Sequence, residues 1–208
     1  MNPVLILYYS AGGRTALLAN TIAKGVEQAG LESWVRTVPK LPRYSDELDG
    51  DEQERALTAQ PAQNGAPYVT LSELSQCSAL ALGSPVRFGN MAAPLKHFID
   101  STSSQWLKGS LINKPACVFS SSSSMHGGQE TTLLSMMLPL IHHGMIICGL
   151  PYSEPELHET ETGGTPYGVT HVERQHLGNT LSEHEISLGI AQGKRLAHLA
   201  KQLQHGDC

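Results

Sequence analysis

Glycine and hydroxyl-bearing residues gather in a segment that joins an apolar run to a helical pattern. The segment is Ser10-Ala11-Gly12-Gly13-Arg14-Thr15, and it follows the apolar run Val4–Tyr9. Small residues let backbone N–H groups approach an anion, and the dipole of the following helix attracts negative charge. The segment therefore fits a phosphate site, although an ordinary tight turn has the same composition. It matches neither G-x-G-x-x-G nor G-x-x-x-x-G-K-[ST], so no dinucleotide fingerprint or NTPase loop is present.

Two further segments of this kind follow later apolar runs. The first combines a rigid turn, a guanidinium, an aromatic ring and a Gly-Asn corner in Gly83-Ser84-Pro85-Val86-Arg87-Phe88-Gly89-Asn90-Met91. It would suit contact with a planar ring, or Phe88 would simply pack on the core. The second runs from Ser120 to Ser124 and continues as Met125-His126-Gly127-Gly128-Gln129-Glu130, a run of hydroxyls and glycines that is also typical of a surface turn. In an open parallel sheet the carboxyl ends of the strands share one edge, so three such segments together favour a common ligand site.

Short apolar runs alternate with longer stretches of helical periodicity, which is typical of a mostly parallel sheet. The runs predict five strands: Val4–Tyr9, Ser33–Val38, Ala79–Gly83, Ala116–Ser120 and Met145–Leu150. Helical spacing predicts helices over Thr15–Gln28, Pro94–Asp100, Glu130–His142 and from Ser182 to about Gln204. Capping boxes at Thr70–Glu73 and Ser182–Glu185 mark two helix starts. We expect an α/β three-layer sandwich: a five-stranded parallel sheet with helices on both faces.

Length and composition limit the class of protein. The 208 residues suit one domain, expected over 1–208 with insertions near 39–69 and 154–178. A net charge of −5 and a pI near 6.0 argue against a nucleic-acid binder. No segment reaches the ~18–20 apolar residues of a membrane span, and the N-terminus lacks the pattern of a signal peptide.

The cysteines and histidines show no pattern of metal ligands. The four cysteines, Cys77, Cys117, Cys148 and Cys208, are scattered, which favours free thiols in a reducing compartment. The ten histidines show no His-Glu-x-x-His or similar spacing, so no metal is expected. The charge run from Glu47 to Arg55 is interpreted as a solvated face. A soluble, cytoplasmic protein follows from these features.

Over essentially its whole length the chain resembles the WrbA family of flavodoxin-like NAD(P)H:quinone oxidoreductases. Leu7-Tyr8-Tyr9-Ser10 and Arg87-Phe88-Gly89-Asn90-Met91 carry part of the resemblance. The most specific segments are Gly127-Gly128-Gln129-Glu130, His142-His143-Gly144-Met145 and Gly163-Gly164-Thr165-Pro166-Tyr167-Gly168. The last two separate the family from electron-carrier flavodoxins.

The resemblance implies a flavodoxin-like fold and an FMN cofactor reduced by NADH or NADPH. Ser10 to Thr15 would bind the FMN phosphate, and Val86 to Asn90 would hold its isoalloxazine ring. The loop from Ser121 to Gly127 would flank the ring, His142 would contact its edge, and Trp106 would line the substrate slot. The family forms homotetramers in which neighbouring subunits contribute to the active site.

The reaction implied is a two-electron reduction of quinones to hydroquinones by ping-pong hydride transfer through the flavin. No catalytic side chain is required beyond the flavin, because the cofactor carries the chemistry. The alternative is a non-enzymatic FMN electron carrier or a redox-responsive binding partner.

This chain departs from the family at Gly12, where members often carry an aromatic residue implicated in nicotinamide contact. From the residues alone, His142 would be a helix end favoured by the dipole, and the resemblance assigns it to the cofactor while His143 stays structural. Trp106 is expected in a loop. Tyr167 would be either a lid or an anchor between subunits.

Overall fold

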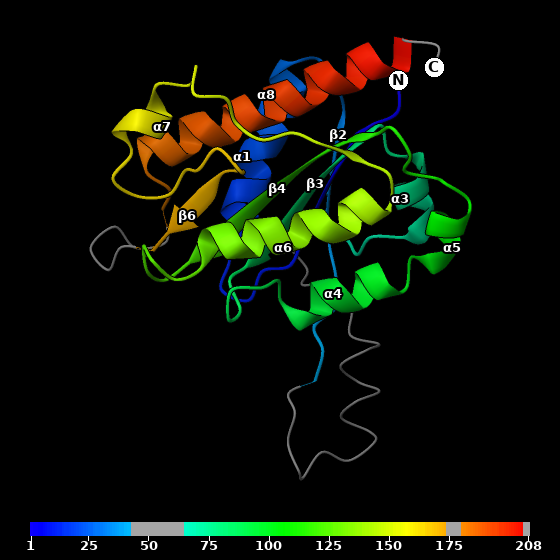
Figure 1. The fold of residues 1–208 in the computed structure, drawn as a ribbon, viewed down its shortest axis with the longest axis horizontal. Coiled ribbons are helices and arrows are strands. Elements are labelled where there is room, and N and C mark those ends of the chain that lie inside the picture. The colour runs from blue at the N-terminus through cyan, green and yellow to red at the C-terminus, as the bar shows by residue number, and fades with distance from the viewer. Residues whose placement is uncertain (43–64, 174–179, 206–208) are drawn as a thin grey trace.

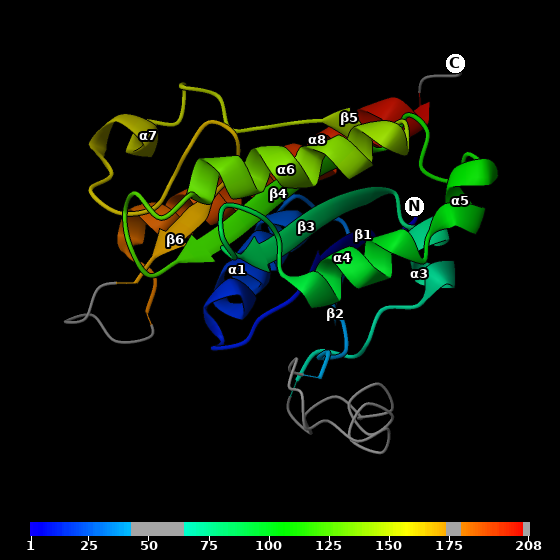
Figure 2. The ribbon, with the colours of Figure 1, turned by 60° about the horizontal axis from the view of Figure 1, so that its bottom comes forward.

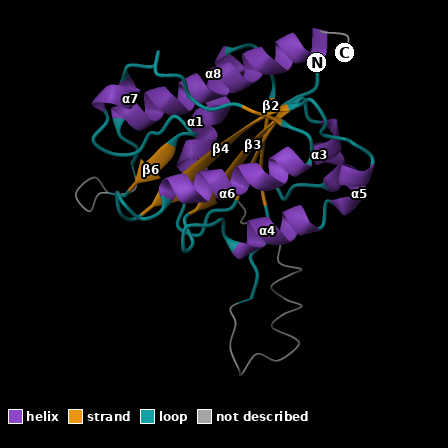
Figure 3. Cartoon of the chain, viewed as in Figure 1, coloured by secondary structure: helices purple, strands orange, loops and turns teal. Residues whose placement is uncertain are grey.

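The computed structural model describes residues 1–42, 65–173 and 180–205. A sheet lies between two layers of helices (Figures 1 and 3). The strands are β1 (Val4–Tyr8), β2 (Ser33–Thr37), β3 (Ala79–Pro85), β4 (Pro115–Ser122), β5 (Ile146–Ile147) and β6 (Thr170–Val172). The helices are α1 (Arg14–Gln28), α3 (Leu71–Gln76), α4 (Ala93–Asp100), α5 (Ser103–Leu107), α6 (Gln129–His142), α7 (Glu156–Glu159) and α8 (Glu183–His205). The predicted three-layer α/β architecture is confirmed.

All strand pairs named in the sheet are parallel, in the order β2-β1-β3-β4-β5, with β6 also paired to β4. Alternate residues of β1 enter two different cores. Val4 and Ile6 pack with α1 and α8, whereas Leu5 and Leu7 pack with α3, α4 and α6. A strand buried on both faces must be apolar throughout, which explains the unbroken run at the N-terminus.

The edge of the sheet beside β4 differs from the prediction. The predicted strand Met145–Leu150 shrinks to Ile146–Ile147, and the region expected to be irregular, 154–178, contributes α7 and β6. After β5 the chain turns away from β4, and the Leu150 N–H donates to the Pro166 carbonyl at 2.9 Å. The remainder of that edge of β4 pairs with β6 instead. A strand of three residues is too short to show a period of two, which is why the sequence did not predict it.

The two capping boxes predicted from sequence are present. Thr70 Oγ1 accepts from the Glu73 N–H at 3.1 Å, and Glu73 accepts from the Thr70 N–H at 2.9 Å. Ser182 and Glu185 make the same reciprocal pair at 3.2 and 2.9 Å at the start of α8. The prediction of a loop at Trp106 is wrong, because the residue lies in the five-residue helix α5.

Helices α1 and α8 lie on one face of the sheet, and α4 and α6 lie on the other (Figure 2). Cys77, Cys117 and Cys148 are free and buried, as expected. The charge run Glu47–Arg55, residue Cys208 and most of the 39–69 insertion lie outside the described residues. None of the described helices is long and apolar enough to cross a bilayer.

Candidate functional site

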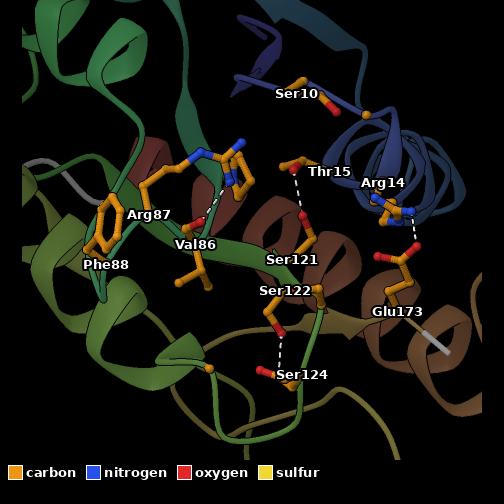
Figure 4. Close-up of a pocket in the computed structure, with 15 residues that line it drawn as sticks. Ser10, Arg14, Thr15, Val86, Arg87, Phe88, Ser121, Ser122, Ser124 and Glu173 are labelled. Carbon is orange, nitrogen blue, oxygen red and sulfur yellow. Dashed lines mark hydrogen bonds and ion pairs between the residues drawn. The ribbon is translucent and has the colours of Figure 1, made fainter. Parts of the chain in front are cut away.

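A cavity of about 460 Å³ opens at the carboxyl ends of β1, β3 and β4. This volume is within the range of small-molecule and cofactor sites, ~300–1,000 Å³. The three segments singled out in the sequence meet there, and Val86 and Phe88 lie across the cavity from Arg14 and Glu173 (Figure 4). The lining residues are Ser10, Ala11, Gly12, Arg14, Thr15, Pro85, Val86, Arg87, Phe88, Ser121, Ser122, Ser123, Ser124, Gly127 and Glu173.

The amino end of α1 forms one wall of the cavity and has no side-chain cap. Gly13 is its N-cap residue and adopts a φ of 87°, which favours glycine. The first turn carries no acidic residue. The free N–H groups and the helix dipole therefore remain available to an anion.

Two polar atoms beside this helix end are buried without a hydrogen-bond partner among the described residues. They are Oγ of Ser10 and Nε of Arg14. Such groups are costly unless a ligand or water satisfies them. By contrast, Thr15 Oγ1 and Ser121 Oγ are hydrogen-bonded at 2.8 Å, which ties the first turn of α1 to the end of β4.

Glu173 was missed by the sequence analysis. It follows β6 directly, lines the cavity, and forms an ion pair with Nη2 of Arg14. The available signal was its place directly after Thr170-His171-Val172, but this short strand was not recognised. The site thus contains a carboxylate where only phosphate-binding groups were expected.

The loop after β3 ends in a tight turn from Arg87 to Asn90. The N–H groups of Arg87 and Asn90 each donate to the other's carbonyl, at 2.9 and 3.0 Å. Phe88 adopts a φ of 53° and Gly89 a φ of 74°. The alternative that Phe88 packs on the core is excluded, because its ring is fully exposed at the cavity.

Gly89 and Asn90 do not line the cavity, but they shape its wall. Asn90 Oδ1 accepts from the Met91 N–H at 2.8 Å and from Ser135 Oγ of α6 at 3.1 Å. On the other side, the buried Gln129 side chain donates to the carbonyls of Ser124 and Met125, both at 2.8 Å. Both loops are therefore held by α6.

Several predicted site residues lie elsewhere in the chain. His142 and Trp106 line a separate cavity of about 480 Å³, and Nε1 of Trp106 donates to the His142 carbonyl at 2.9 Å. Met125 and His126 line a third cavity of about 380 Å³ with threonines 162, 165 and 170. Gly13 caps α1 rather than lining the main cavity.

His143 is bound within its own chain, as a structural role requires. Its Nε2 lies 2.9 Å from Thr102 Oγ1. Burial, and then the neighbouring His142, lower the pKa of His143 below its ordinary value. The neutral ring is therefore favoured.

A buried acid–base pair lies at the foot of β6. His171 Nδ1 donates to Glu185 Oε2 at 2.9 Å, and both side chains are buried. Burial alone would raise the pKa of Glu185, but hydrogen bonds from His171 and from the Ser182 and Val172 N–H groups lower it. Glu185 is therefore ionised and ties α8 to β6.

Neither metal nor thiol chemistry is supported. The described ranges hold no group of three or more His, Cys, Asp or Glu side chains able to bind a metal ion. Burial raises the pKa values of Cys77 and Cys148 to about 11 and that of Cys117 well above its ordinary value. The thiolates needed for reactivity are thus disfavoured.

Comparison with known proteins identifies the chain as a flavodoxin-like flavoprotein. The family model described as "NADPH-dependent FMN reductase" matches residues 3–153, so the chain belongs to that family. A relative from Solidesulfovibrio magneticus, named NAD(P)H dehydrogenase (quinone), is 41% identical over 97% of this chain and 98% of its own. A relative of the same name from Geotalea daltonii is 39% identical over 96% and 97%.

Two solved structures share the fold of this chain. A WrbA-like flavodoxin from Agrobacterium tumefaciens has a TM-score of 0.66 at 19% identity, covering 97% of this chain and 99% of that chain. An archaeal flavodoxin has a TM-score of 0.60 at 16% identity, covering 98% and 99%. These two establish the fold, and the resemblance found in the motifs is confirmed.

The chain is therefore an NAD(P)H-dependent flavoprotein oxidoreductase with FMN as its cofactor. The cavity fits that cofactor on grounds of its own. A phosphate at the amino end of α1 would satisfy both Ser10 Oγ and Arg14 Nε, the two unpartnered donors described above.

Proposed function

We propose that this cavity binds FMN and that the enzyme uses it to reduce quinones with NAD(P)H. Ser10 to Thr15 bind the phosphate. Val86 to Asn90 hold the isoalloxazine ring on one side, and Ser121 to Gly127 flank it on the other. The observation that carries the proposal is the unsatisfied, uncapped helix end facing a cavity of cofactor size.

The residues named above would hold FMN, which would supply the two-electron redox chemistry between NAD(P)H and the quinone. The chain supplies binding and electrostatics. Arg87 is exposed and donates from Nη1 to its neighbouring carbonyl, that of Val86, at 2.8 Å. The guanidinium keeps its remaining N–H groups for negative charge on the ring. The exposed Phe88 ring offers a flat apolar surface to a planar partner.

NAD(P)H and the quinone would both approach the flavin from the open side of this one cavity. Nicotinamide must then leave before the quinone enters, which gives ping-pong kinetics. No side-chain nucleophile or metal takes part. The buried free thiols also fit a reducing compartment, and we place the enzyme in the cytoplasm.

The test is to load the purified protein with FMN and follow NADH and NADPH oxidation with and without benzoquinone. We expect rapid oxidation only with quinone, and parallel double-reciprocal lines when both substrates are varied. Arg87→Ala should slow quinone turnover or shift the flavin potential. FMN binding with no steady turnover would instead favour the electron carrier, and failure to bind FMN would contradict the whole proposal.

We further propose a homotetramer in which His142 and Trp106 serve the cavity of a neighbouring copy. Neither residue lines the FMN cavity of its own chain. Leu134, Leu138 and Ile141 of α6 are exposed although the opposite face of the helix is already buried. A helix that is apolar all round is normally covered on every side.

A further inference from the structure

One carboxylate lies among the groups that line the proposed FMN cavity. Glu173 is the only acidic residue in that lining among the described residues, and Arg14 and Arg87 are the two cations. Glu173 is held at the end of β6 by its N–H, which donates to the Ser122 carbonyl at 2.9 Å. The position of the charge is thus fixed by the sheet.

The partner of Glu173 is the first residue of the helix that faces the phosphate. Arg14 gives Nη2 to Glu173, and its Nε stays buried and unpartnered. A Cβ atom added to Gly12 would lie 3.2 Å from Nη1 of Arg14, so the guanidinium lies over the phosphate loop. Arg14 therefore touches both the loop and the carboxylate (Figure 4).

A phosphate and Glu173 then act on the same guanidinium with the same sign of charge. An anion at the amino end of α1 is attracted by Arg14 and repelled by Glu173. Both side chains of the pair are about 30% exposed, so solvent reduces this effect without removing it. Freeing Arg14 would raise the positive potential of the cavity.

We propose that Glu173 lowers FMN affinity by competing with the flavin phosphate for the positive charge of Arg14. The inference rests on FMN binding in this cavity, as proposed above. Glu173 holds Nη2 of Arg14 while Nε stays available to the phosphate, so the carboxylate neutralises part of the charge that would attract FMN. Glu173 acts through Arg14 and takes no part in the redox step.

If Glu173 only positioned Arg14, replacing Glu173 would change FMN affinity in the opposite direction. If Glu173 only oriented Arg14 toward the phosphate, its neutralisation would weaken FMN binding. The two roles can therefore be separated by the direction of one change. Riboflavin, which lacks the phosphate, isolates the contribution of the ring.

The experiment measures dissociation constants of FMN and riboflavin by quenching of flavin fluorescence in the wild type, Glu173→Gln, Arg14→Gln and the double variant. We expect Glu173→Gln to bind FMN about fivefold more tightly, equivalent to ~1 kcal/mol, and riboflavin unchanged. The gain should shrink at high salt. It should also shrink in the Arg14→Gln background, where only the direct repulsion between Glu173 and the phosphate is left to relieve.

Glu154→Gln is the matched control, since it removes one negative charge from a residue that does not line the cavity. An equal gain in that control would assign the effect to net charge and overturn the inference. Weaker or unchanged FMN binding in Glu173→Gln, with thermal unfolding confirming the fold, would overturn it while leaving the proposed function intact. Absence of FMN binding in the wild type would refute both.

Discussion

Phe88 holds an unusual backbone conformation with no packing to compensate for it. Its φ is 53°, in the region that favours glycine, and its ring is fully exposed. Left-handed backbone costs an ordinary residue ~1–2 kcal/mol. A large apolar ring in such a place supports the proposal that Phe88 contacts the flavin.

We expect Phe88→Gly to leave folding stability nearly unchanged and to weaken flavin binding. Relief of the strained φ offsets the larger chain entropy of glycine, so the unfolding free energy should change by less than ~1 kcal/mol. Loss of the ring contact should weaken FMN binding by ~0.5–1.5 kcal/mol. Urea unfolding and flavin titration measure the two quantities.

Asn113→Gly is the matched control, because Asn113 also has a positive φ, 62°, and lies outside the cavity. Asn113→Gly should change neither the unfolding free energy nor the affinity for FMN by much. A Phe88→Gly variant that unfolds easily but binds FMN normally would show that the ring is structural.

At the scale of residues, the sequence predicts a role where the chemistry of a residue and that of its neighbours favour the same one. Ser10 to Thr15 were predicted as a phosphate site because composition and the following helix both favour an anion, and all of them except Gly13 line the cavity. Glu173 was not predicted, since its strand is too short to show a pattern and its partner Arg14 is 159 positions away. Long-range ion pairs leave no local trace in one sequence.

At the scale of elements, the contact between α1 and α8 depends on glycines. A Cβ atom on Gly25 would lie 2.2 Å from the Ile190 carbonyl oxygen, and one on Gly193 would lie 2.1 Å from that of Ile22. Both obstacles are backbone atoms, which cannot move aside as a side chain can. The two helices therefore approach to backbone contact.

Gly25→Ala should destabilise the protein, although alanine usually favours a helix. The intrinsic gain of ~0.5–1 kcal/mol is outweighed by overpacking, which costs ~1–3 kcal/mol or more. Urea unfolding measures the net change. Lys24→Ala, at an exposed neighbouring position of α1, should stay within ~0.5 kcal/mol of the wild type. Equal or greater stability in Gly25→Ala would mean that the helices separate readily.

Glu185 joins α8 to β6 and makes the stability of this junction pH-dependent. Its Oε1 accepts from the N–H groups of Gly163 and Val172, each at 3.0 Å. Because its pKa is lowered from the ordinary 4.5 in the folded state, the stabilisation is complete above pH 4.5. It is lost as the pH falls through the lower, folded-state pKa.

Glu185→Gln should cost about 3–5 kcal/mol at neutral pH, since it breaks a buried pair with His171. The difference in unfolding free energy between this variant and the wild type should become smaller below pH 4.5. Urea unfolding on both sides of that pH measures it. Glu183→Gln, at an exposed site in the same helical turn, should show no such narrowing. If Glu185→Gln differed from the wild type in unfolding free energy by the same amount at all pH values, the pH dependence assigned to Glu185 would be wrong.

The long, periodic elements were predictable, and the short ones were not. α1 was predicted to within one residue, because its apolar stripe and Gly30 mark both its face and its end. β5, β6 and the helix that contains Trp106 have two, three and five residues. Such elements are set by tertiary contacts rather than by their own pattern.

At the scale of the whole molecule, the outer side of α6 is an apolar surface that stays exposed in the described part of the chain. Leu134, Leu138 and Ile141 recur at helical spacing on the outer side of α6, beyond the core that its other face covers. Exposed Trp106 reaches the end of this helix through its bond to His142. Large exposed apolar surfaces mark interaction sites, and the proposed homotetramer supplies a partner.

Leu138→Glu should therefore shift the assembly toward smaller species, measured by sedimentation velocity. A buried leucine contributes ~1.5–3 kcal/mol, and a symmetric interface would lose this contribution in each copy. Leu203→Glu places the same charge on an exposed leucine of α8, on the opposite face of the sheet, and should leave the mass unchanged.

If His142 and Trp106 act on a neighbouring cavity, the dissociated Leu138→Glu variant should lose quinone turnover while retaining FMN through Ser10 to Thr15. An unchanged mass, or full turnover in the separated subunits, would show that the cavity is complete within one chain.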